Sequence, residues 1–129
     1  MLGCKNILSF LLVLISLVSF GQQVVDLSHQ NLTEIPDSLK PKKELASLIL
    51  TGNPLKSLPE WLTELPVLKS LVLDEIWTLP VIASFKLLSN CPALTELSWQ
   101  KGKLIFLPAS ISEFNSLRHL NLSHNGLIK

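Results

Sequence analysis

Apolar residues in this chain recur in short pairs separated by one residue, and each pair is followed by a polar turn. The pairs are Leu48/Leu50, Leu71/Leu73, Leu97/Trp99 and Leu120/Leu122. Side chains two residues apart point to the same face of a β-strand, so each pair predicts a short strand with one apolar face. Such a strand buries that face only against its neighbours. The pattern predicts parallel strands stacked around one continuous core, with longer return segments on the outside.

The pairs belong to units of nearly constant length. Units open at Leu45, Leu68, Leu94 and Leu117, which gives lengths of 23, 26 and 23 residues. A first unit lies 23 residues before the second, because Leu27 precedes Leu50 by that distance. The fifth unit stops at Lys129 after about a third of its length. A fixed period of this size is the signature of a repeat architecture.

The consensus of these units is L-x-x-L-x-L-x-x-N-x-L followed by x-x-L-P-x-x-L-x-x-L, which resembles the typical 23-residue leucine-rich repeat. The resemblance covers residues 24–129, as four full units and a partial fifth. It implies an α/β fold: a solenoid forming a curved horseshoe arc, with short parallel strands on the concave face and short helical or extended segments on the convex face. It also implies a non-catalytic function in binding.

Two departures from the consensus stand out. The asparagine position reads Gln30, Asn53, Ile76, Gly102 and Asn125. Neither Ile76 nor Gly102 has a side chain that bonds backbone groups of the turn, and an unsatisfied buried group costs about 1–3 kcal/mol. Unit three is also longer, with the extra residues between Trp77 and Leu87. Leu79-Pro80 is one candidate for its displaced Leu-Pro pair, and residues 83–88 are a candidate convex helix.

The N-terminus reads as a secretory signal peptide over residues 1–21. Lys5 precedes 14 uncharged residues, Ile7 to Phe20, and Ser19 and Gly21 supply small residues for cleavage after Gly21. A bilayer-spanning helix needs about 20 apolar residues, so an uncleaved membrane anchor is the less favoured alternative. We therefore predict a signal peptide at 1–21, a repeat domain at 22–129, and an exported, secreted or cell-surface protein with no membrane span once the signal is cleaved.

Composition narrows the function further. Without residues 1–21 the chain has 10 basic and 10 acidic residues, so it presents no electrostatic footprint for nucleic acid or an anionic membrane. Cys91 is then the one cysteine left, in a position that leucine holds in unit two, which predicts an inert core thiol and no internal disulfide. The histidines form no ligand cluster, and Asp74 and Glu75, being adjacent, diverge. We expect no enzyme activity, no metal site and no cofactor.

The residues that flank the paired leucines are the candidate binding site, because repeat solenoids use this concave surface. They form three columns, one residue per unit. The first is Val24, Ser47, Ser70, Glu96 and His119; the second is Asp26, Ile49, Val72, Ser98 and Asn121; the third is Ser28, Thr51, Asp74, Gln100 and Ser123. Most are small and polar, with an apolar spot at Ile49 and Val72 and acids at Asp26, Asp74 and Glu96. Such a face suits a polar or mildly basic partner.

Three functions remain open from the sequence. The favoured one is an exported module that binds a protein, or less often a peptide or glycan, through the concave face. In the second, the repeats are the sensor or scaffold part of a larger receptor or effector whose activity lies beyond Lys129; Leu120 and Leu122 on an uncapped edge favour such a continuation. The third is a structural or adhesive element tethered by an uncleaved N-terminal helix.

Overall fold

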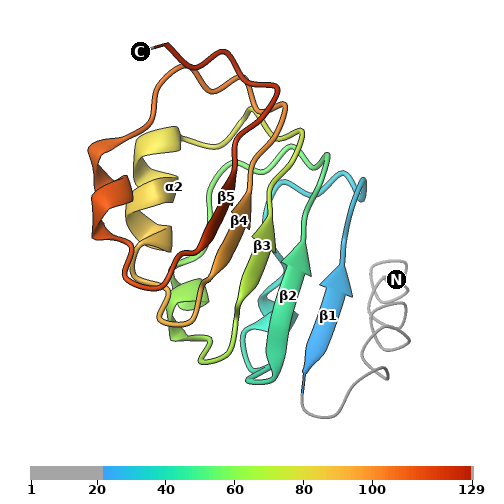
Figure 1. The fold of residues 1–129 in the computed structure, drawn as a ribbon. Helices are drawn as coiled ribbons and strands as arrows, with labels where there is room; N and C mark the ends of the chain where they lie inside the picture. The colour runs from blue at the N-terminus through green and yellow to red at the C-terminus, as the bar shows by residue number, and fades with distance from the viewer. Residues whose placement is uncertain (1–21, 129) are drawn as a thin grey trace.

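The computed structural model describes residues 22–128, which form a five-stranded parallel sheet with the strands in chain order (Figure 1). The strands are β1 (Gln23–Asp26), β2 (Leu45–Ile49), β3 (Ser70–Val72), β4 (Glu96–Ser98) and β5 (His119–Asn121). The signal peptide expected at residues 1–21 lies outside the described part of the chain. Each repeat therefore contributes one short strand, as the alternating leucines predict.

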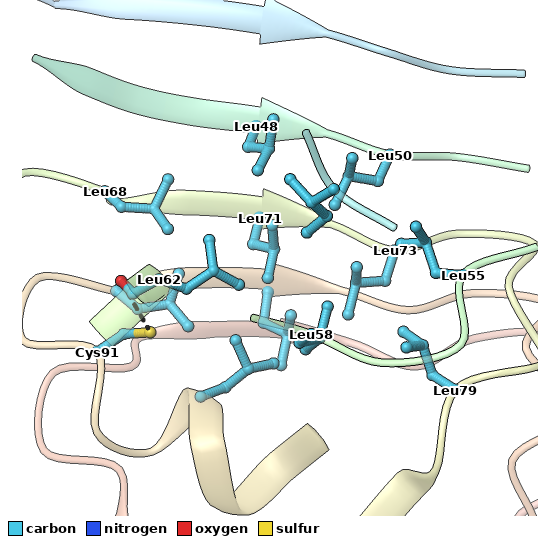
Figure 2. Close-up of a cluster of buried hydrophobic side chains, with 14 of the residues drawn as sticks. Leu48, Leu50, Leu55, Leu58, Leu62, Leu68, Leu71, Leu73, Leu79 and Cys91 are labelled. Carbon is cyan, nitrogen blue, oxygen red and sulfur yellow. Dashed lines mark hydrogen bonds between the residues drawn. The ribbon is translucent and has the colours of Figure 1, made fainter. Parts of the chain in front are cut away.

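From β2 to β5 the strands pair without a shift between units, whereas the pairing of β1 with β2 is irregular between Gln23 and Val24. Leu48 lies opposite Leu71, Leu71 opposite Leu97, and Leu97 opposite Leu120. Figure 2 shows the leucines of neighbouring units lying together between the sheet and the return segments. Leu48 and Leu71 are fully buried, whereas Leu120, on the outermost strand, is 37% exposed. The predicted stacking of paired leucines into one core is confirmed, and the core ends at β5.

The return segments carry the helical turns on one side of the sheet (Figure 1). They are the 3-10 helices η1 (Asp37–Leu39), η2 (Glu60–Glu64) and η3 (Ala109–Glu113) and the α-helix α2 (Val81–Leu88). A proline directly precedes each of them: Pro36, Pro59, Pro80 and Pro108, with φ between −75° and −61°. The proline ring presets this φ, and the missing N–H is one that the first helical turn leaves without a partner in any case. The Ile35-Pro36 pair and the three Leu-Pro pairs thus set where the helical turns begin.

Unit three differs from its neighbours in two compensating ways. Leu79 follows Ile76 by three residues, whereas the equivalent leucine, Leu58, follows Asn53 by five. From Pro80 to the next unit's first leucine there are 14 residues, against nine after Pro59. Unit three therefore has two residues fewer before its Leu-Pro pair and five more after it, which gives the net excess of three. The added residues form α2, which confirms the candidate helix and places its start at Val81.

Helix α2 is joined to unit four by aromatic packing. The Phe85 ring stacks on Trp99 with centroids 5.6 Å apart and meets Phe114 edge-on at 6.3 Å. Phe85 and Trp99 are both fully buried. Offset and edge-to-face aromatic pairs add to the gain from burial alone. The extra residues of unit three are therefore part of the core.

The asparagine contacts are made at two of the interfaces between units. Asn53 Oδ1 accepts from the amides of Gln30 and Leu32, and its Nδ2 donates to the carbonyls of Leu27 and Leu50, all at 2.9–3.0 Å. Asn125 repeats this arrangement at the other end, with Oδ1 accepting from the Gly102 and Leu104 amides. Asn53 is buried and Asn125 is half-buried, and the hydrogen bonds of each side chain join its own turn to that of the preceding unit.

Trp99 makes a different link in the middle of the stack. Its indole Nε1–H donates to the Ile76 carbonyl at 2.8 Å. Gly102 makes room for the indole, because a Cβ at this position would lie 2.5 Å from Nε1. The sequence correctly marks Ile76 and Gly102 as lacking the asparagine contact. The carbonyl of Ile76 is nevertheless satisfied, by a residue that the consensus assigns to the core alone.

The residue that opens each turn has a left-handed backbone. These residues are His29, Gly52, Glu75, Lys101 and His124, with φ between 54° and 75°. Their amides donate to the next unit, as from His29 to the Thr51 carbonyl and from Gly52 to that of Asp74. Non-glycine residues seldom adopt this conformation, which carries a steric penalty of about 1–2 kcal/mol. At His29, Gly52, Glu75 and Lys101 the hydrogen bond to the following unit holds the backbone in this conformation.

Candidate functional site

The sheet face turned away from the return segments is the candidate binding surface, and we call it the open sheet face. Strand pairing aligns Ser47, Ser70, Glu96 and His119 across β2 to β5 and aligns Ile49, Val72, Ser98 and Asn121 beside them. Backbone bonds from each turn to the next align the third column, since the Gly52 amide reaches Asp74 and the Glu75 amide reaches Gln100. The structure brings the members of each predicted column together in one line.

Exposure varies along the columns. Ser47, Ile49, Ser70 and Val72, in the middle of the sheet, are half-buried. The outer positions are more open; Asp26, Glu96, His119 and Asn121 are exposed, and Val24 is 41% exposed. A half-buried centre with charged and polar groups around it resembles the division of a protein interface into core and rim.

Two hollows adjoin on this face. One has a volume of about 550 Å³ and is lined by residues that include Ser70, Val72, Glu96, Ser98, His119 and Asn121. The other has a volume of about 380 Å³, and its lining includes Val24, Ser47, Lys69, Ser70, Thr95 and Glu96. Ser70 and Glu96 line both. The Glu96 carboxylate has no ion pair within residues 22–128, so it stands as a free charge between two concave surfaces.

The other two acids of this face are used internally. Asp74 Oδ1 accepts from Ser98 Oγ at 2.7 Å and from the Gln100 amide at 2.8 Å, and Oδ2 accepts from Gln100 Nε2 at 3.2 Å. Asp26 Oδ1 accepts from both the amide and the hydroxyl of Ser28. Charge-assisted bonds of this kind are short and comparatively strong. Asp26 and Asp74 therefore hold the turns, and the acids of this face do not have equal roles.

The same network extends to the sheet edge. The Ser123 amide donates to Asn121 Oδ1, and the single hydroxyl proton of Ser123 is shared between Gln100 Oε1 at 2.8 Å and Asn121 Oδ1 at 2.7 Å. Asx residues followed two positions later by serine favour such local turns. The spacing of Asp26 to Ser28 and of Asn121 to Ser123 was the signal in the sequence for these contacts, and the sequence reasoning missed it.

Three residues at the border of the hollows were also missed. Lys69, Thr95 and Arg118 each precede a first-column residue, and they line one hollow or the other. Their backbones bridge units, since the Lys69 carbonyl accepts from the Thr95 and Glu96 amides. Aligning the position before the first column would have found them. Lys69 lines one hollow and Arg118 lines the other, so the surface is of mixed charge.

Groups that are common in catalysis are dispersed. Within residues 22–128 no three His, Cys, Asp or Glu side chains lie close enough to hold a metal ion. Cys91 is buried with its Sγ 3.7 Å from the Leu62 carbonyl (Figure 2). Desolvation by burial raises the pKa of this thiol to about 11, so it stays protonated at neutral pH. A protonated, buried thiol is a poor nucleophile.

The three tryptophans lie in different environments. Trp99 is buried, as predicted. Trp61 is buried in η2, where its Nε1 donates to Asp37 Oδ1 at 3.3 Å. Trp77 is 57% exposed, and Lys103 Nζ lies 4.7 Å from its ring centroid. Separately, no helix in residues 22–128 has the length and apolar character needed to cross a membrane.

Comparisons with known proteins agree with this geometry. The sequence profile of the family described as Leucine Rich Repeat matches residues 116–129. The chain is 31% identical over 103 residues to Receptor like protein 23 of Arabidopsis thaliana, across 77% of this chain. The chain spans 12% of the length of that relative. The profile match, this relative and the five stacked strand-and-turn units together support a leucine-rich repeat protein.

Proposed function

We propose that residues 22–129 form an exported, non-catalytic leucine-rich-repeat module, a curved solenoid that binds a protein ligand through the open sheet face as its concave face. The observation that carries this proposal is the free Glu96 carboxylate between two adjoining hollows. A basic side chain of the ligand fits there, and the half-buried Ile49 and Val72 accept a small apolar group. Peptide and glycan ligands are the less favoured alternatives.

A site-specific photo-crosslinker tests the face. Placed at Ser70, it is expected to capture a discrete partner from the native extracellular fluid. Placed at Glu64, which is exposed at the end of η2 on the return side, it is expected to capture none. Equal capture from both positions would show that the open sheet face has no special role.

The charge at Glu96 gives a second readout. Glu96→Lys is expected to lower partner capture at Ser70 about tenfold, since it places a like charge against a basic group. Glu44→Lys, an exposed acid just before β2, is the matched control and is expected to leave capture unchanged. Unchanged capture by the Glu96 variant would assign binding to other groups.

Export rests on the signal peptide that we predict for residues 1–21. N-terminal sequencing of the protein from its native source is expected to begin at Gln22. A retained Met1 would favour the tethered alternative, in which case the protein would stay with membranes after carbonate extraction.

The second function, the sensor part of a larger receptor or effector, draws support from the name of the Arabidopsis relative. The intact mass of the native protein distinguishes the two proposals. A mass equal to residues 22–129 favours the small secreted binder, and a larger mass favours the receptor or effector.

A further inference from the structure

A groove lies on the return side of the molecule, between η2 and α2, away from the open sheet face. Its volume is about 620 Å³, and its lining includes Leu58, Glu60, Thr63, Ala83, Ser84 and Leu87. We call it the η2–α2 groove. The return segments of the other units have 3-10 turns of three to five residues, whereas α2 has eight. The groove is therefore a product of the residues that unit three has gained.

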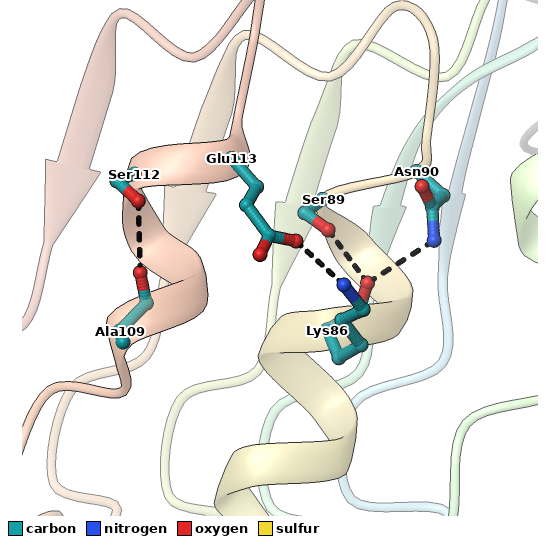
Figure 3. A network of polar contacts seen from close by, with 6 residues as sticks. All are labelled: Lys86, Ser89, Asn90, Ala109, Ser112 and Glu113. Atoms are coloured by element: carbon teal, nitrogen blue, oxygen red, sulfur yellow. Dashed lines mark hydrogen bonds and ion pairs between the residues drawn. The ribbon is translucent and has the colours of Figure 1, made fainter.

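The groove combines apolar walls with one free negative charge. Leu58, Ala83 and Leu87 supply apolar surface. Lys86, at the border, is neutralised by Glu113 of η3, with Nζ 2.7 Å from Oε1 (Figure 3). Glu60 has no ion pair among the described residues. The charge left for a ligand is thus acidic.

Ser84 adds an unused hydrogen-bonding group. The residue is 2% exposed, and its Oγ has no partner among the described residues. The other polar side chains at this end of α2 are satisfied, because Ser89 Oγ and Asn90 Nδ2 both donate to the Lys86 carbonyl (Figure 3). An unpaired buried hydroxyl is destabilising, and a hydroxyl can turn about χ1 toward a new partner. A bound amide or carbonyl would relieve this cost.

We propose that the η2–α2 groove binds a peptide segment in which a basic residue adjoins an apolar one. The aliphatic stem of the basic side chain packs on Leu58 and Leu87, as long cationic side chains do on apolar surface. Its charged end pairs with Glu60, and a main-chain group of the peptide meets Ser84. The apolar neighbour of this basic residue packs against Ala83, which lines the same groove. This site is separate from the open sheet face and does not depend on the function proposed for that face.

Titration of the ¹⁵N-labelled protein with two short peptides tests the site. The probes are N-acetyl-Ala-Arg-Leu-Ala-amide and its counterpart with glutamine in place of arginine. The arginine peptide is expected to shift the amide signals of Thr63, Ala83 and Leu87 saturably. It should bind about three- to fivefold more tightly than the glutamine peptide, which is the range of an exposed ion pair.

Variants separate the parts of the proposal. Glu60→Gln is expected to make the two peptides bind equally, whereas Glu64→Gln, in the same helical turn but outside the groove, keeps the preference. Ala83→Trp fills the groove and should weaken both peptides about tenfold, with the remaining amide spectrum unchanged as evidence of folding. Three results would overturn the proposal: no saturable shifts up to about 10 mM peptide, an arginine preference that survives Glu60→Gln, or shifts confined to Ser70 and Ser98. The last result would instead support binding at the open sheet face.

Discussion

Among the glycines in residues 22–128, Gly52 leaves the least room for a Cβ. It has the left-handed backbone shared by all five turns, with φ of 75°, and a Cβ there would lie 2.3 Å from His29 Nδ1. Gly52→Ala is expected to lower the free energy of unfolding by about 2 kcal/mol, from backbone strain plus steric overlap. Urea unfolding measures the change.

The steric part of this effect can be separated from the strain. His29→Ala removes the ring that Gly52→Ala would meet, so the double variant should lose less stability than the sum of the single variants. Strictly additive losses would show that backbone strain alone is responsible.

Trp99 and Gly102 act as a pair. Trp99→Leu restores the consensus core residue but leaves the Ile76 carbonyl without its donor and a cavity behind, so a loss of about 3–5 kcal/mol is expected. Gly102→Asn alone clashes with the indole. In the double variant the asparagine can bond the turn as Asn53 does, and stability should recover in part. A double-mutant cycle in chemical denaturation measures the coupling free energy between the two substitutions. A coupling free energy near zero would contradict the prediction that Trp99 and Gly102 act as a pair.

The Cys91 thiol predicts an alkaline loss of stability. Burial raises its pKa from 9.0 to about 11, so the folded state retains a proton that the unfolded chain releases. The stabilisation is complete below pH 9 and is lost as the pH rises to about 11, a total of about 2–3 kcal/mol. Cys91→Ala is expected to be less stable at neutral pH and to show a shallower decline over this interval. Parallel curves for the two proteins would refute the prediction.

Among the elements, α2 depends on one side chain for its attachment. Phe85 is fully buried against Trp99 and Phe114, so Phe85→Ala should cost about 3–5 kcal/mol. Ile82→Ala, on the exposed side of the same helix, is the matched control and should change stability by less than about 0.5 kcal/mol. Thermal and urea unfolding measure both variants. Similar losses would mean that helix propensity, and not aromatic packing, holds α2.

At the scale of the whole molecule, the β5 end of the sheet has exposed apolar side chains beside it. Next to the β5 edge, Ile105 is 57% exposed and Ile128 is 73% exposed, and the Ile128 amide donates to the Ile105 carbonyl at 3.0 Å. Within residues 22–128 no strand pairs with the outer side of β5, and apolar surface beside such an edge favours association. Ile105→Lys/Ile128→Lys should reduce concentration-dependent self-association in sedimentation velocity. Ile82→Lys, equally exposed on α2, should not.

The sequence predicted the sheet because burial enforces its pattern. A strand shifted by one residue would turn its leucines to solvent, so the alternation at Leu48 and Leu50 determines which face is buried. The start of α2 was less predictable. The shortened step to Leu79 and the lengthened step after Pro80 partly cancel, so unit length alone does not locate either change. The Trp99 bond to Ile76 follows no consensus rule and is visible only in the structure.

The candidate site was predictable in its position but not in its chemistry. Strand register places Ser70 beside Glu96, and the repeat gives that register directly. Whether an acid is free or engaged depends on side-chain contacts between units. Asp74 and Glu96 look alike in the sequence, yet Asp74 is bonded to Ser98 and Gln100 whereas Glu96 lines two hollows. Such contacts join residues about one repeat apart. An alignment of the repeats does not show which side chain of the neighbouring unit an acid will contact.

The uneven length of unit three has a consequence for how this architecture can diversify. The strand pairing between β3 and β4 is as regular as that between β2 and β3, although the intervening segment is three residues longer. The spacing of the strands thus does not depend on the length of the return segment that joins them. Insertions can therefore change the shape of the return side while the strand spacing of the open sheet face stays the same. The two surfaces of this chain are thus free to evolve at different rates.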